Sequence, residues 1–132
     1  MTANPDTPCT TLQDLIRQDQ EKIDRLLLEL ETFNDSETLQ QRFVQLYKEL
    51  TVHAEAQEET VYPVVRSFYG DDNVKQRHDE QAEIKLLLYA MRILSPTSPE
   101  FREKLKNLRQ LITQHFHYIE TTMFVAISNH FS

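Results

Sequence analysis

The chain has 132 residues, of which 39% are apolar and 27% are charged, with a formal net charge of −7 and one cysteine. This length and composition fit a single soluble domain and exclude a disordered chain. The negative charge argues against a nucleic acid or an anionic membrane as partner, since both attract a basic surface. The lone Cys9 excludes an internal disulfide, which favours a reducing, cytoplasmic compartment.

The distribution of helix breakers predicts an all-α protein. Gly70 is the only glycine, and the five prolines leave long uninterrupted stretches. Residues 1–10 are expected to form a flexible amino-terminal tail and residues 11–132 a helical bundle. The first helix is predicted to begin after Thr11 and to end at Asn34-Asp35. Its apolar side chains recur at intervals of three and four, as one buried stripe requires: Leu12, Leu15, Ile16, Ile23, Leu26, Leu27 and Leu30.

The rest of the chain contains three more helical segments. A second helix is expected from Ser36 to about Val61, with a bend at Pro63. A third helix is predicted from the pair Asp71-Asp72 to the proline-rich segment at residues 95–99, and a fourth helix opens at Pro99. The short connections predict an antiparallel up-down-up-down four-helix bundle.

An internal repeat relates the two halves of the chain. The first and third helices share the pattern Gln-x-x-Ile-x-x-Leu-Leu, which places Gln20 and Gln81 at equivalent inward positions. The second and fourth helices share a histidine followed five residues later by a glutamate. The matched pairs in these two helices are His53 with His115, Gln57 with Ile119, and Glu58 with Glu120.

The segment His53-Ala-Glu-Ala-Gln57-Glu58-Glu59-Thr-Val-Tyr62-Pro63 resembles a motif of the hemerythrin-like, or HHE cation-binding, family. The resemblance covers all four predicted helices and implies a bundle that holds two irons. It also implies that intact members bind iron or a gas such as O₂ or NO. Of the ligand positions that the resemblance implies, only His53 and His115 keep a ligand residue. The others have changed from His to Gln20, from Glu to Gln57, from His to Gln81 and from a carboxylate to Ile119.

An intact di-iron centre is not expected, because iron prefers imidazole and anionic carboxylate ligands and glutamine offers only a neutral carbonyl. The first interpretation is therefore a buried, hydrogen-bonded layer without a cofactor. The protein would then be a non-catalytic binding or regulatory module with an unknown protein partner. The members of this predicted layer are Gln20, His53, Gln57, Gln81 and His115.

A second interpretation keeps a metal, either iron or another divalent ion, at a mononuclear centre that binds or senses O₂, NO or iron. Each glutamate of such a centre would have to reach around its helix, because five residues correspond to about 500° of rotation. A haem between the two histidines is disfavoured by the Leu, Ile and Phe side chains of the interior. No nucleophile is paired with a base, so no enzyme activity is predicted. The predicted metal ligands are His53, His115, Glu58 and Glu120, with His78 as a less favoured addition and with His117 and His130 outside the site.

Overall fold

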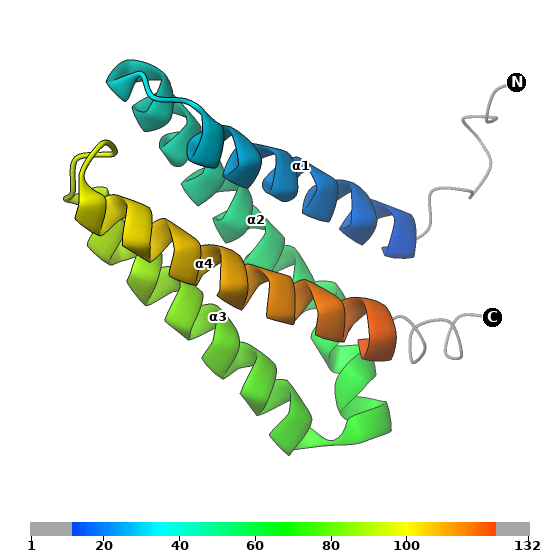
Figure 1. Ribbon diagram of the computed structural model, residues 1–132. Coiled ribbons are helices and arrows are strands. Elements are labelled where there is room, and N and C mark those ends of the chain that lie inside the picture. The colour runs from blue at the N-terminus through cyan, green and yellow to red at the C-terminus, as the bar shows by residue number, and fades with distance from the viewer. Residues whose placement is uncertain (1–11, 124–132) are drawn as a thin grey trace, which may run out of the picture.

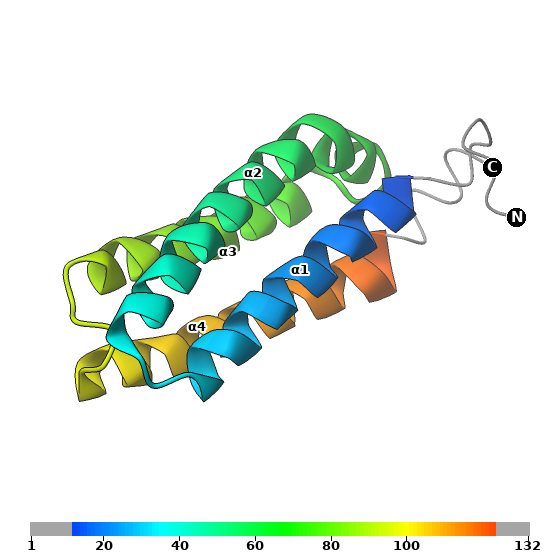
Figure 2. The ribbon, with the colours of Figure 1, turned by 90° about the horizontal axis from the view of Figure 1, so that it is seen from above.

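The computed structural model describes residues 12–123, which form an antiparallel up-down-up-down bundle of four long helices (Figures 1 and 2). This confirms the predicted all-α class. Helix α1 packs against α2, α2 against α3, and α3 against α4, while α4 closes the bundle against α1. The helices are α1 (Leu12–Thr32), α2 (Ser36–Tyr69), α3 (Asp71–Arg92) and α4 (Pro99–Tyr118), followed by the short π-helix η1 (Ile119–Met123).

The starts of α2 and α4 follow from local side-chain capping. The Asp35 carboxylate accepts a hydrogen bond from the Thr38 amide at 2.9 Å, and the Ser98 hydroxyl accepts one from the Phe101 amide at 3.2 Å. Both amides belong to the first turns of their helices, where no carbonyl is available to them. The predicted opening of the fourth helix at Pro99 is therefore confirmed. Predictions for the tail, Cys9, Thr11 and His130 lie outside the described residues.

Helix α2 is longer than predicted, since it continues through Pro63 to Tyr69. Proline removes one hydrogen bond and crowds the preceding turn, and Figure 1 shows α2 bending toward its carboxyl end. Burial compensates for the proline, because this end of α2 belongs to a second apolar cluster. Gly70 then ends the helix with a φ of 90°. The cluster comprises Ile16, Val61, Tyr62, Val65, Val74 and Ile119.

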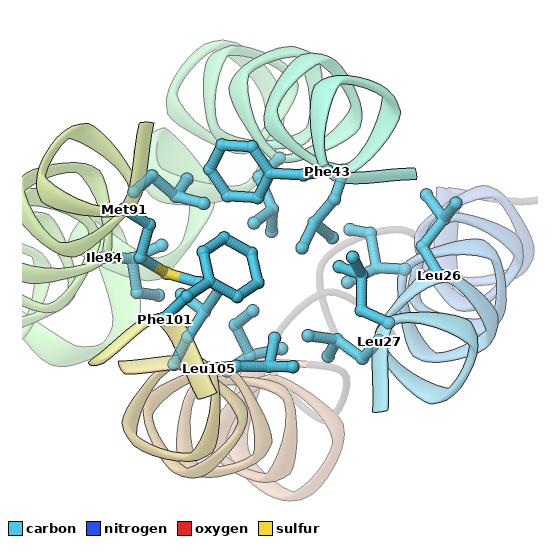
Figure 3. Packing of buried hydrophobic residues seen from close by; sticks show 14 of the residues in the cluster. Leu26, Leu27, Phe43, Ile84, Met91, Phe101 and Leu105 are labelled. Carbon is cyan, nitrogen blue, oxygen red and sulfur yellow. The ribbon is translucent and has the colours of Figure 1, made fainter. Parts of the chain in front are cut away.

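The main core fills the opposite half of the bundle, and Figure 3 shows its side chains converging from all four helices. Phe43 of α2 and Phe101 of α4 meet edge to face with ring centroids 5.4 Å apart. Most of the predicted stripe of α1 is buried, namely Ile16, Ile23, Leu26, Leu27 and Leu30, whereas Leu15 is 48% exposed. The two apolar clusters leave a band between them, and the polar side chains of the candidate site occupy this band. Within residues 12–123, no helix is long and apolar enough to cross a membrane.

Candidate functional site

Five polar side chains from the four helices are buried in the band between the two apolar clusters. Each was predicted to point inward, and each is at most 5% exposed. Helix α2 contributes two of them at a spacing of four residues, which places both on one face of the helix. The five residues are Gln20, His53, Gln57, Gln81 and His115.

Gln57 connects three of the other side chains through one amide group. Its Nε2 atom lies 2.8 Å from Nε2 of His53, and its Oε1 atom lies 2.9 Å from Nε2 of His115. The same oxygen accepts a hydrogen bond from Nε2 of Gln81 at 3.0 Å. A carbonyl oxygen has two lone pairs, so both bonds to it are compatible. We call this set of four residues (His53, Gln57, Gln81 and His115) the Gln57 network.

Carboxylates contact the outer nitrogens of both histidines. Nδ1 of His53 lies 3.6 Å from the Asp19 carboxylate of α1, and Nδ1 of His115 lies 3.0 Å from the Glu80 carboxylate of α3. Because Gln57 donates to His53 Nε2, the His53 proton resides on Nδ1, facing Asp19. Both ring nitrogens of His115 face oxygen acceptors. Each ring nitrogen of His115 therefore has a hydrogen-bond partner, Glu80 at Nδ1 and Gln57 at Nε2.

Burial keeps His53 in its neutral form. Desolvation is the main cause that lowers the pKa of His53 from 6.5 to about 4, and the nearby His115 lowers it further, while Asp19 opposes the shift. A neutral His53 is required for Nε2 to accept the hydrogen bond from Gln57. The lowered pKa of His53 and the hydrogen bond from Gln57 therefore both indicate a neutral ring.

Two amide atoms of the predicted layer do not take part in the network. Nε2 of Gln20 and Oε1 of Gln81 are buried and have no partner among the described residues. Gln20 is therefore buried as expected but is not joined to the other four side chains. Ile119 is fully buried in the second apolar cluster, beside Tyr62 and Val65, so this position contributes packing only.

The two glutamates of the predicted mononuclear centre lie apart from the histidines. Glu58 is exposed, and its carboxylate lies 3.8 Å from Nδ1 of His78 on the outer surface. Glu120 is exposed at a surface groove that His117 also lines. The structure thus brings His53 and His115 together through Gln57 but does not bring these carboxylates to them. No group of three or more potential metal-binding side chains occurs within residues 12–123.

The donor set of this site does not fit the di-iron centre that the family resemblance implies. The Nε2 atoms of both histidines are already engaged by Gln57, which occupies the space between the rings. The remaining inward groups are amides, which supply no anionic charge to balance two metal ions. A cavity of about 30 Å³ beside the network, lined in part by Gln81 and Phe116, is also far too small for a haem. It exceeds the roughly 10–15 Å³ that one water molecule requires.

Sequence reasoning missed Arg77, which is buried one turn before Gln81 on α3. Its guanidinium stacks 3.6 Å from the centre of the Tyr118 ring and lies 3.5 Å from the Glu80 carboxylate. Arg77 therefore orients the same carboxylate that contacts His115. The spacing of four residues from Gln81 is the signal that could have revealed an inward side chain.

Comparisons with known proteins support the resemblance stated above. A family model described as the hemerythrin HHE cation binding domain matches residues 11–127. A DNA nickase from Nostoc sp. (strain PCC 7120) is 42% identical over 132 residues, which make up 100% of this chain and 38% of that relative. The chain thus spans well under half of the length of this curated relative. No solved structure matches the chain.

The expectation that the chain has no nucleic-acid partner is contradicted by this relative, whose name connects it with DNA. The prediction relied on the net charge of −7. Net charge is a sum over the whole surface and does not describe how basic side chains are distributed. It also carries no information about those parts of the relative that this chain does not cover. The charge argument was therefore too coarse to exclude a nucleic acid.

Proposed function

Because this chain belongs to the hemerythrin HHE cation-binding domain family, we propose that it is a metal-free member of that family which acts as a binding or regulatory module. The observation that carries this proposal is the position of the Gln57 amide, whose two ends contact Nε2 of His53 and of His115 at 2.8 and 2.9 Å. The family resemblance assigns both of these histidines to metal. In this module they are held by hydrogen bonds.

The 42% identity to a DNA nickase suggests the kind of process in which this module works. We propose that it works in DNA processing, as a part that positions or regulates the cleavage of DNA. The buried network supports a structural role for these side chains, since their polar groups bond to one another inside the bundle. A surface that contacts a partner would then carry the function.

Elemental analysis tests the metal-free state. The chain would be expressed with iron supplied, purified without a metal-binding tag and examined by plasma mass spectrometry. We expect no stoichiometric metal, and we expect a chelator to leave the melting temperature unchanged, because a metal bound only to the folded state would add to stability. Two irons per chain would overturn the proposal. One metal per chain would also overturn it and would favour a mononuclear centre, for which Glu58→Gln and Glu120→Gln would test whether the two glutamates are ligands.

A second candidate function is DNA nicking by the bundle itself. The 42% identity to the nickase extends over 132 residues, that is, over the whole of this chain, which is the observation in favour of this candidate. Relaxation of supercoiled plasmid by the purified chain, with and without Mg²⁺ or Mn²⁺, separates the two functions. The binding-module proposal expects intact supercoiled plasmid under both conditions. Nicking that co-purifies with the chain and disappears in His115→Ala would favour the second candidate.

A further inference from the structure

Several basic side chains of the bundle pair with carboxylates, but three exposed ones on the face between α2 and α3 do not. Elsewhere, Arg42 lies 2.9 Å from the Glu29 carboxylate. In the described part of the chain, Lys48, Lys85 and Arg92 form no ion pair, although all three are exposed. Neighbouring carboxylates therefore do not neutralise these charges, which remain available to an anionic partner.

The packing of α2 against α3 brings these three side chains to one surface. Lys48 and Arg92 line the same depression of about 310 Å³. Lys85 lies about two turns before Arg92 on α3, with Tyr89 between them at helical spacing. Lys85 also lines the cavity beside the Gln57 network, together with Thr51 of α2, and no carboxylate lines either hollow. We call the surface formed by Lys48, Lys85, Tyr89 and Arg92 the cationic face.

Aromatic side chains lie among these cations. The Arg92 guanidinium stacks 4.7 Å from the centre of the Tyr89 ring, which belongs to a residue that is 58% exposed. Stacking holds the guanidinium plane at the surface, while the N–H groups in that plane can still donate to a phosphate. Phe43, Val44 and Tyr47 line the adjoining depression, so its lining is largely apolar and partly aromatic. Unpaired bases stack on aromatic rings and on guanidinium planes.

We propose that the cationic face binds single-stranded DNA, with phosphates at Lys48, Lys85 and Arg92 and a base at the aromatic depression. This inference rests on the proposed role in DNA processing and names the surface and the strand for that role. A single strand is favoured over a duplex, because it exposes the faces of its bases to aromatic side chains. An acidic protein segment would meet the cations but would not supply the planar groups that nucleobases offer to the rings.

The net charge of −7 limits the strength of this binding. Exposed charges that lie more than about 8–10 Å apart are largely screened at physiological salt, so carboxylates on the far helices contribute little at the cationic face. We therefore expect weak binding that depends strongly on salt, with a dissociation constant of roughly 10⁻⁵ M, as is common for contacts that read phosphate rather than sequence.

Fluorescence anisotropy of a labelled single-stranded oligonucleotide, titrated with the chain at several salt concentrations, tests this surface. We expect the double variant Lys48→Glu/Arg92→Glu to bind about tenfold more weakly and with a shallower salt slope, because lost phosphate contacts release fewer counterions. The matched control is Arg25→Glu/Lys106→Glu, which replaces one exposed arginine on α1 and one exposed lysine on α4. Both double variants change the net charge equally, so a difference between them reports where the cations lie.

The aromatic part of the cationic face has a separate test. Tyr89→Ala should weaken binding about fivefold and leave the salt slope unchanged, because a stacked base carries no charge to the ring. Circular dichroism would verify that each variant remains helical, as substitutions at exposed positions rarely unfold a domain.

The possible failures separate this inference from the proposed function. Equal losses in the two double variants would overturn the inference alone, because DNA would then bind elsewhere on the chain. Displacement of the oligonucleotide by polyglutamate or by duplex DNA as effectively as by unlabelled single strand would also overturn it, in favour of an acidic protein or a duplex. No binding by the wild-type chain would overturn it as well, and would leave the metal-free state standing, since elemental analysis tests that state without DNA.

Discussion

The Gln57 side chain offers a donor and an acceptor on one planar group, and it uses them on two different histidines. A glutamate at this position would have only acceptors, and without a metal it would add a buried negative charge. A leucine would leave Nε2 of both histidines without a partner. Glutamine thus supplies the hydrogen bonds that both histidines need when no cation is bound. These bonds are necessary because the whole network is buried between two apolar clusters, away from water.

Sequence reasoning predicted which side chains lie in this layer, because helical spacing decides which residues point inward. It could not predict which of these side chains form hydrogen bonds with one another. Gln20 and Gln81 are equivalent in the repeat, yet only Gln81 donates to Gln57. Asp19 and Glu80 escaped notice because each contacts a histidine on another helix. Such contacts depend on distances between helices, which the spacing within one helix does not contain.

Replacement of Gln57 by leucine tests the contribution of the network to stability. Gln57→Leu keeps the volume but leaves Nε2 of both histidines and the Gln81 amide without a partner. We therefore expect a loss of about 2–4 kcal/mol in the free energy of unfolding. Urea denaturation would measure it. The matched control is Gln45→Leu, an exposed position on the same helix, which should change stability by less than about 0.5 kcal/mol. Similar losses in both variants would mean that the network does not stabilise the bundle.

The neutral His53 predicts a dependence of stability on pH. The pKa of His53 is about 4 in the folded chain and 6.5 in its ordinary state, so the unfolded chain binds more protons between these values. Its contribution is complete above pH 6.5, falls as the pH is lowered and is lost near pH 4. The loss is on the order of 3 kcal/mol. Urea denaturation at a series of pH values should show a flatter profile for His53→Gln than for the wild type, and identical profiles would refute this assignment.

The ends of the helices show which local signals are strong enough to predict an element. Ser98 and Pro99 fixed the start of α4 because the cap and the restricted proline φ act within one turn. Pro63 misled the prediction for α2, since its local cost is outweighed by the burial of Val61, Tyr62 and Val65. This burial depends on partners from α1, α3 and η1, which a reading of α2 alone does not supply.

The Ser98 cap leads to a prediction at this scale. The Ser98 hydroxyl accepts from the Phe101 amide and donates to the Ser95 carbonyl at 2.7 Å, so it joins the loop to the helix. We expect Ser98→Ala to lower the free energy of unfolding by about 0.5–2 kcal/mol. Ser98→Asp should retain most of the stability, because its carboxylate can accept from the same amide. If Ser98→Asp were as unstable as Ser98→Ala in urea denaturation, the hydroxyl would not act as a cap.

At the scale of the whole molecule, the two halves of the bundle are similar but not identical, and the difference lies at the site. His53 and His115 occupy equivalent positions, whereas Gln57 corresponds to Ile119. One amide is sufficient to bond both histidines, so a second glutamine at position 119 would be buried without a hydrogen-bond partner. The isoleucine instead closes the apolar cluster at that end of the bundle. The two halves therefore differ at the position where the family resemblance implies a carboxylate ligand.

The same comparison predicts how a metal site could be restored in this scaffold. The combination of Gln20→His, Gln57→Glu, Gln81→His and Ile119→Glu with the native His53 and His115 would supply six imidazole and carboxylate ligands, within the roughly five to seven that a di-iron centre needs. The buried carboxylates should destabilise the metal-free variant, and iron should raise its melting temperature. Elemental analysis should then find iron, while addition of His53→Leu should abolish its uptake. If the variant is folded but takes up no iron, the assignment of these positions to the family motif is wrong, because six correctly placed ligands should bind iron.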